Sequence, residues 1–191
     1  TMKFISLALV LALCVVATLA QGHIRPKLDE NFSAEISVVT KFKGKQFSLH
    51  GEWFMDYEGR REAFDAEMLH VGRVDLIRIY NISKEYLYRP KHDHCEEHAI
   101  EHPFYGLFEW VNLAKEVPGG CKDFNGDKEG AKWEYTLSKD GKPLLEVSMC
   151  SSDDGTEPYW VNLEAHADEF DREVIFKNYK PGRPDGKRFL L

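Results

Sequence analysis

The alternation of apolar and polar residues through much of the chain most constrains what it can fold into. In the segment FSAEISVVTKF, the side chains of Phe32, Ala34, Ile36 and Val38 share one face, because successive side chains of a strand point to opposite faces. The same period of two recurs in QFSLHGEWFMDYE, REAFDAEML, RVDLIRIYNI and KEYLYRP. Gly51, inside the first of these, predicts a bulge. Short turns between such segments are typical of an antiparallel sheet.

The second half of the chain returns to this pattern after one interruption. Residues 94–117 break the alternation and place Leu107, Val111 and Ala114 at helical spacing. Strands then follow in KWEYTLS, PLLEVSMC, EPYWVNLEAHA and REVIFKNY, and the Asp-Gly pair at 140–141 is a hairpin signal. The sequence therefore predicts a mainly β, α+β fold, in which a helical excursion crosses a curved antiparallel sheet of about eight to eleven strands.

The first twenty residues predict a secretory signal peptide. Lys3 supplies the positive charge, the residues from Ile5 to Val16 are almost wholly apolar, and Thr18 and Ala20 are small residues that suit cleavage after Ala20. The apolar run is shorter than the ~20 residues that span a bilayer. We therefore expect a secreted, extracellular protein with no transmembrane segment, whose mature chain, residues 21–191, forms a single domain.

Composition and sequons agree with an extracellular protein. Asn31 in NFS and Asn81 in NIS are acceptors for N-glycosylation. The formal net charge of −7 disfavours nucleic-acid binding. Basic residues gather only near the end of the chain, where we expect a solvated and flexible tail from about residue 180. These residues are Lys177, Lys180, Arg183, Lys187 and Arg188.

Several stretches resemble a known superfamily. FMDYEGRREAF ends a strand in an aromatic-Asp-Tyr motif before Arg60 and Arg61, and IYNISKEYLYRPKHDHC has spaced tyrosines ending at a cysteine. These stretches resemble the ependymin-related and LolA-like superfamily of secreted half-barrel proteins. GGCKDF followed by GAKWEYTL is similar in spacing to the non-catalytic N-terminal domain of some invertebrate papain-like cysteine proteases. The chain lacks the N-terminal and C-terminal cysteines of ependymins, which puts their full disulfide pattern in doubt.

The resemblance implies both a function and a disulfide. The resemblance implies a carrier that holds a fatty acid or phospholipid in an apolar cleft of a curved sheet. Ependymins are also associated with calcium. After loss of Cys14 with the signal peptide, spacing alone leaves all three pairings of Cys95, Cys121 and Cys150 open. The resemblance favours a bridge between Cys95 and Cys121, which leaves Cys150 free or available to link a homo-oligomer.

Large residues on the predicted inward faces are candidates for the wall of the cleft. We expect Ala66 among them, and Arg78 at the mouth, facing the carboxylate or phosphate of a ligand. The same large residues could instead simply fill the core, since core packing is their commonest use. The candidates are Phe47, Leu49, Phe64, Ala66, Met68, Leu76, Arg78, Trp133, Tyr135, Trp160 and Leu163.

Two segments could bind metal, but neither has a complete motif. His94, His98 and His102 recur every four residues, as zinc ligands on one face of a helix would, yet the order HCEEH is not that of a metalloprotease. DFNGDKEGAKWE places acidic or amide residues at the first positions of a calcium loop, but Lys128 occupies the position that requires glycine. We therefore expect no cofactor, with calcium or zinc as weak alternatives.

No catalytic motif is present: the sequence has neither a Gly-x-Ser-x-Gly elbow nor a phosphate-binding loop. We therefore do not expect an enzyme. Two hypotheses remain. One is a secreted glycoprotein that carries a hydrophobic small molecule. The other is an extracellular matrix or interaction glycoprotein, calcium-associated and disulfide-linked, without such a ligand.

Overall fold

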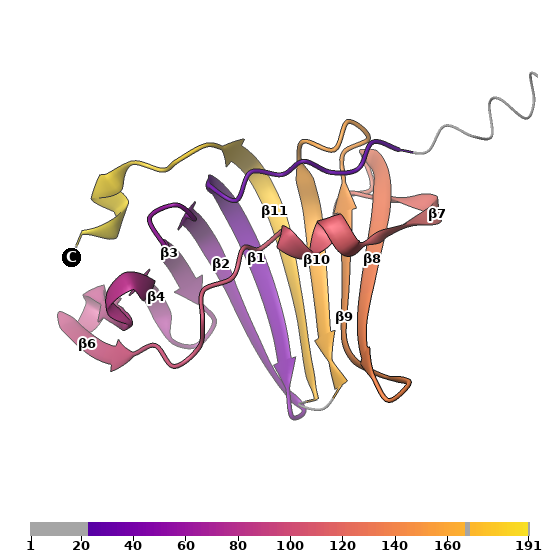
Figure 1. Ribbon diagram of the computed structural model, residues 1–191. Coiled ribbons are helices and arrows are strands. Elements are labelled where there is room, and N and C mark those ends of the chain that lie inside the picture. Colours follow the sequence, from indigo (N-terminus) through magenta and orange to yellow (C-terminus); the bar gives the residue numbers. More distant parts are fainter. Residues whose placement is uncertain (1–22, 167–168, 191) are drawn as a thin grey trace, which may run out of the picture.

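The computed structural model describes residues 23–166 and 169–190, so the predicted signal peptide lies outside the described residues. They form one eleven-stranded antiparallel sheet (Figure 1), which confirms the mainly β prediction. The strands are β1 (Phe32–Phe42), β2 (Lys45–Asp56), β3 (Arg61–Met68), β4 (Gly72–Ile79), β5 (Lys84–Arg89), β6 (His94–Ala99), β7 (Lys115–Lys122), β8 (Glu129–Lys139), β9 (Lys142–Ser151), β10 (Pro158–Ala165) and β11 (Phe170–Pro181).

The sheet consists of two meanders that meet at its centre. Its strand order is β6-β5-β4-β3-β2-β1-β11-β10-β9-β8-β7, so β1 and β11 are neighbours. Every other hydrogen-bonded pair joins strands that follow one another in the chain. Because β6 lies at one edge and β7 at the other, the connection between them must cross the whole sheet. We call this connection, residues 100–114, the strap (Figure 1).

The predicted helical excursion is far smaller than expected. In the strap only η3 (Glu109–Leu113) is helical, and it is a short 3-10 helix. Val111 and Ala114 are buried, a spacing of three that suits three residues per turn. The predicted helical segment begins instead with the edge strand β6, paired with β5 from Arg89–His94 to Lys84–Ala99. The other short helices are η1 (Tyr80–Ile82), η2 (Pro90–His92) and η5 (Gly186–Phe189).

The sheet has two unlike faces. We call the face that packs against the strap the inner face and the opposite one the outer face. Strand register places Ala34, Trp53 and Phe64 side by side across β1, β2 and β3, and these inner-face residues belong to the main core or pack against it. Its most deeply buried members include Phe32 and Met149, both 0% exposed.

The inner face is concave, and Gly51 contributes to the close approach of its strands. The rings of Trp53 and Phe176 are 6.4 Å apart although β1 lies between their strands, whereas two strand spacings of a flat sheet are about 10 Å. A Cβ atom on Gly51 would lie 2.1 Å from the backbone oxygen of Asp65. Register runs through Gly51 without a shift, so the expected bulge there is wrong. The glycine permits close contact between strands instead.

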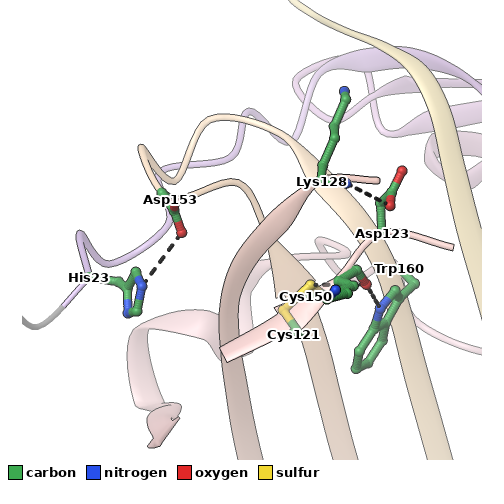
Figure 2. The surroundings of a disulfide bond; sticks show 8 residues. His23, Cys121, Asp123, Lys128, Cys150, Asp153 and Trp160 are labelled. Carbon is green, nitrogen blue, oxygen red and sulfur yellow. Dashed lines mark hydrogen bonds and ion pairs between the residues drawn. A yellow bond between two sulfur atoms is a disulfide. The ribbon is translucent and has the colours of Figure 1, made fainter. Parts of the chain in front are cut away.

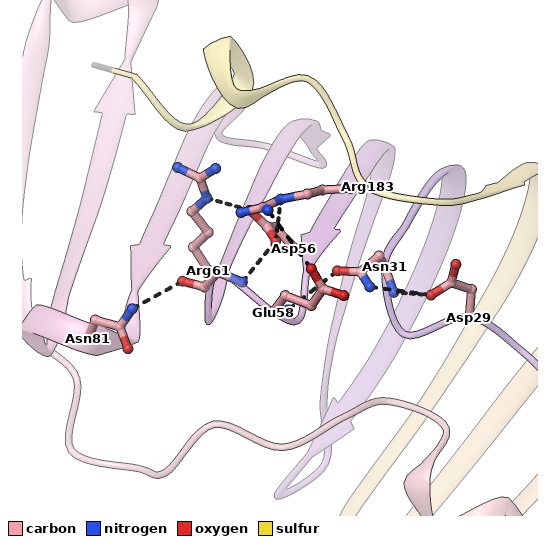
Figure 3. A network of polar contacts seen from close by, with 8 residues as sticks. Asp29, Asn31, Asp56, Glu58, Arg61, Asn81 and Arg183 are labelled. Atoms are coloured by element: carbon pink, nitrogen blue, oxygen red, sulfur yellow. Dashed lines mark hydrogen bonds and ion pairs between the residues drawn. The ribbon is translucent and has the colours of Figure 1, made fainter.

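The C-terminal segment is packed against the sheet, contrary to the solvated tail that we expected. Phe189 is 4% exposed and joins Phe54, Ala63 and Ile77 in a second core on the outer face. Arg183 forms an ion pair with the fully buried Asp56 (Figure 3). Charge composition predicted solvation, but apolar Phe189 and a buried carboxylate on β2 hold this segment.

Candidate ligand-binding face

The strap fills one end of the inner face. Phe108 of the strap lies with its ring 5.8 Å from that of Phe32 and 6.1 Å from that of Phe176. Phe32 also contacts Trp53 and Tyr179. These aromatic contacts form a packed core, so the expected apolar cleft is closed beneath the strap.

Polar residues before β1 hold the strap in place. Glu30 Oε1 accepts the backbone N–H of Phe108 at 2.8 Å. Arg25 Nη1 donates to the carbonyl oxygens of Val111 at 2.6 Å and of Ala114 at 2.9 Å. Burial is the main cause that raises the pKa of Glu30 to about 7. The strap is therefore fixed through its backbone by the preceding segment of the chain.

The other end of the inner face, near the turns that join β1 to β2 and β8 to β9, is not covered by any residue of 23–166 or 169–190. There Phe47 is 50% exposed, Leu137 46% and Phe42 40%, and the strap crosses the strands well away from these turns (Figure 1). Half-buried apolar residues connect this end to the core. We call this surface the open trough; it consists of Phe42, Phe47, Leu49, Tyr135, Leu137, Leu145, Leu163 and Phe170.

Register places every predicted cleft residue except Trp160 on the inner face. Trp160 lies on the outer face, where its Nε1 donates to the carbonyl oxygen of Lys122 at 3.0 Å. It borders a polar hollow of about 400 Å³ that Lys41 and Glu173 also line. The inner-face candidates are Phe47, Leu49, Phe64, Ala66, Met68, Leu76, Arg78, Trp133, Tyr135 and Leu163.

Arg78 is not available to a ligand headgroup as expected. Its Nη1 lies 3.1 Å from Glu62 Oε1, and its Nε pairs with Glu85. Glu62 is 5% exposed and also accepts hydrogen bonds from Trp53 Nε1 at 3.2 Å and from the Tyr80 hydroxyl at 2.8 Å. Burial alone would lower the pKa of Arg78, but the two carboxylates outweigh it and raise the pKa. Arg78 therefore stays charged within a closed polar network.

Arg172 of β11 is an inner-face cation that our sequence prediction missed. It lies opposite Leu163 on β10 and Thr40 on β1. Its Nε donates to Thr40 Oγ1 at 3.2 Å, and its Cζ lies 4.9 Å from the centre of the Phe170 ring. Within residues 23–166 and 169–190, it forms no ion pair with a carboxylate. The two-residue period of a strand could have revealed this position, because Arg172 is two residues from the apolar Val174 and therefore lies on the same face.

The disulfide joins Cys121 to Cys150 (Figure 2), so the expected Cys95–Cys121 bridge is wrong. The two Cα atoms are 5.9 Å apart, within the range that a disulfide spans. Cys95 lies on β6, at the edge of the sheet opposite β7, and is an exposed free thiol. Cys150 is 0% exposed and bonded, which also excludes it as the expected link of a homo-oligomer.

The histidine-rich segment forms no helical zinc face. His94 and His98 lie on β6, and their Nε2 atoms approach the two carboxylate oxygens of Glu96 at 3.4 and 3.3 Å. His102 is exposed in the strap. Among the described residues, the three potential ligands that converge are instead the exposed side chains of Glu146, Glu164 and His166, with the imidazole between the two carboxylates.

The proposed calcium loop is a turn whose first carboxylate is already used. Asp123 Oδ1 accepts the backbone N–H of Asp127 at 2.7 Å and of Lys128 at 3.0 Å. The bond to the Lys128 amide is the main cause that lowers the pKa of Asp123. An EF-hand loop is followed by a helix, whereas this segment leads into strand β8.

The two sequons differ in their surroundings (Figure 3). Asn81 is exposed in η1, and its Nδ2 donates to the carbonyl oxygen of Gly59 at 3.2 Å. Asn31 is half-buried, and its Nδ2 lies 3.4 Å from Asp29 Oδ1. Glycosylation at either position stays a prediction, with Asn81 the more accessible of the two.

No protein-family model matches the chain, and no curated protein matches its sequence. Among solved structures, the lipoprotein LppX of Mycobacterium tuberculosis is similar over 81% of this chain and 90% of its own, with 10% identity and a TM-score of 0.52. A conserved protein of Thermus thermophilus matches with 6% identity over 83% of this chain and 84% of its own, at a TM-score of 0.49. A LolA superfamily protein of Nitrosomonas europaea matches with 7% identity over 87% of this chain and 93% of its own, at a TM-score of 0.39.

The match to LppX shows a shared fold. The solved structures that match also include proteins described as LolA superfamily and lipoprotein-sorting proteins. For this chain, the ependymin-related and LolA-like resemblance stays a prediction. No helix in the described part of the chain is long and apolar enough to span a bilayer.

Proposed function

We propose that this chain is a secreted carrier that binds the apolar part of a small amphiphile in the open trough. One observation carries the proposal: large apolar side chains at this end of the inner face are exposed to solvent. Phe47, Leu137 and Phe42 are each at least 40% exposed, next to residues of the packed core. Apolar surface that is contiguous and uncovered is typical of a binding site.

The energetics of such a site need no dense set of polar contacts. A ligand gains ~0.8 kcal/mol for each methylene group that it removes from water. The trough residues lie on strands that are paired in the sheet, so the backbone beneath the trough is in place before a ligand arrives. This reduces the entropic cost of binding.

The other parts of the proposal rest on the sequence. The predicted signal peptide supports secretion, and the sequons at Asn31 and Asn81 support a glycoprotein. We propose no catalytic activity and no resident cofactor. If the trough binds no apolar molecule, an extracellular interaction protein is the better interpretation, and the trough would then receive a protein partner.

Titration of the neutral fluorescent probe N-phenyl-1-naphthylamine tests the proposal. Leu137→Asn and Leu144→Asn are a matched pair, because both residues lie in the β8–β9 hairpin but on opposite faces. Leu137 is 46% exposed in the trough and Leu144 is 38% exposed on the outer face. We expect Leu137→Asn to weaken probe binding about fivefold, as loss of part of one leucine contact predicts, and Leu144→Asn to leave it unchanged. Absence of binding, or equal effects of the two variants, would overturn the proposal.

A further inference from the structure

The arginines of the strands differ in one respect. Arg61, Arg73, Arg78 and Arg89 each form an ion pair with a carboxylate. Arg172, the remaining strand arginine, forms none with any residue of 23–166 or 169–190. An arginine presents five N–H donors, and within the same ranges only the Nε–H of Arg172 has a protein acceptor, Thr40 Oγ1.

The surroundings of Arg172 are apolar. Its neighbours in the same inner-face row are Leu163 and, beyond Thr40, Phe47. Phe170 packs against the guanidinium. The side chain of Arg172 is nevertheless exposed to solvent, so an anion can reach its guanidinium from solution. Partial desolvation, and next the like charge of Arg78, lower the pKa of Arg172.

The inner-face carboxylates of β3, β5 and β6 are already paired with other arginines. Glu62 and Glu85 form ion pairs with Arg78, and Glu96 with Arg89. The open trough therefore combines an apolar floor with one guanidinium that is unpaired, and whose terminal N–H groups are unused, among the residues that the structure describes. A guanidinium binds a carboxylate or phosphate through two parallel hydrogen bonds.

We infer that the ligand of the open trough is an anionic amphiphile, whose carboxylate or phosphate is bound by Arg172 while its hydrocarbon chain lies over the trough. This inference rests on the proposed function, since it names the class of ligand for the same site. Arg172 thereby takes the role that the sequence suggested for Arg78.

Competition between matched ligands and the bound neutral probe tests the headgroup separately from the trough. Dodecanoate, dodecyl phosphate and 1-dodecanol share one chain and differ in the head. We expect at least one of the two anions to displace N-phenyl-1-naphthylamine at concentrations about tenfold lower than the alcohol does, in line with a charge-assisted hydrogen bond. The comparison of dodecanoate with dodecyl phosphate then shows whether a fatty acid or a phosphate lipid is preferred.

Arg172→Gln should abolish this preference for anions while probe binding is retained. Lys177→Gln is the control, because it removes one positive charge from the exposed outer side of the same strand. Equal displacement by all three ligands, or a preference that survives Arg172→Gln, would overturn the headgroup inference and leave the carrier proposal standing. Failure of the probe to bind at all would instead overturn the carrier proposal.

Discussion

Glu30 Oε1 accepts the backbone N–H of Phe108 at 2.8 Å, although the two residues are separated by the strands β1 to β6. The second carboxylate oxygen, Oε2, is buried without a hydrogen-bond partner among the described residues. This carboxyl group therefore lies between the sheet and the strap in a place that disfavours its charge.

Stability should consequently fall as the pH rises through neutrality. Burial raises the pKa of Glu30 from 4.5 to about 7, so the folded protein holds a proton that the unfolded chain releases. The stabilisation is fully present below about pH 4.5 and is lost as the pH rises through 7. We expect Glu30→Gln, which keeps the acceptor oxygen without the charge, to be more stable than the wild type by about 1–3 kcal/mol at pH 8, after allowance for the partial exposure of Glu30.

Urea unfolding at pH 5 and pH 8 measures this effect. Glu173→Gln, at an exposed outer-face position, should leave the difference between the two pH values as in the wild type. If the free energy of unfolding changes equally between pH 5 and pH 8 in the wild type and in Glu30→Gln, the prediction is wrong.

Removal of the buried carboxylate of Asp56 should release the C-terminal segment. Asp56 is 0% exposed and accepts bonds from the Gly59 amide at 2.9 Å and from Arg61 Nε at 2.8 Å, while Arg183 Nε lies 3.0 Å away. Burial alone would raise the pKa of Asp56, but these three groups outweigh it and lower the pKa. Asp56→Asn leaves two guanidinium groups without their anion and should cost ~3–5 kcal/mol.

Limited proteolysis distinguishes local release from general unfolding. Arg183→Gln, in which Arg61 still pairs with Asp56, should cost less than Asp56→Asn. It should nevertheless expose the bonds after Lys187 and Arg188 to faster cleavage by trypsin. Lys180→Gln serves as the charge control. Cleavage at the same rate in the wild type, Arg183→Gln and Lys180→Gln would show that Arg183 does not hold the segment.

The disulfide between Cys121 and Cys150 should stabilise the β7–β9 side of the sheet. The two cysteines are 29 residues apart, and closure of a loop of this length contributes ~3 kcal/mol. We expect the double change Cys121→Ser with Cys150→Ser to lower the free energy of unfolding by about this amount, and Cys95→Ser to change it little. Peptide mapping without reduction should find Cys95 alone alkylated; a peptide joining Cys95 to either partner would refute the pairing.

A methyl group at Gly51 should disrupt the concave sheet. It would lie 2.1 Å from the Asp65 oxygen and 2.6 Å from the Ala66 Cα, both backbone atoms that cannot rotate away. Gly51→Ala should therefore cost ~2–4 kcal/mol. Gly44→Asn, at a turn with a φ of +75° and open space around it, should cost much less because asparagine tolerates this conformation. Thermal unfolding of the two variants side by side checks this prediction.

Alternation predicted the strands well because the two-residue period is a property of each segment alone. The same period places Trp160 and Leu163 on opposite faces, since they are three residues apart in β10, so the sequence was sufficient to exclude Trp160 from the cleft. Residue spacing could not predict that the helix is so short, because the spacing of Val111 and Ala114 suits a 3-10 turn as well as an α-helix.

The polar part of the site depended on contacts between distant segments. Arg78 and Arg172 each alternate with apolar residues, and the sequence gives no reason to prefer either. What separates them is the neighbouring strand: Glu62 and Glu85 lie opposite Arg78, whereas Thr40 and Leu163 lie opposite Arg172. The disulfide was missed for the same reason, because spacing does not reveal which strands flank β8.

The meeting of β1 and β11 at the centre of the sheet has a consequence for the kinetics of folding. Each meander can grow through hairpins between consecutive strands, which form in about 1–10 μs. The pairing of β1 with β11 instead requires contact between residues that are far apart in the sequence, such as Val38 and Val174. Such a non-local contact has a large loop-closure cost before it gains any hydrogen bond. We therefore expect this pairing to limit the folding rate, with the inner face becoming concave only when the two halves join.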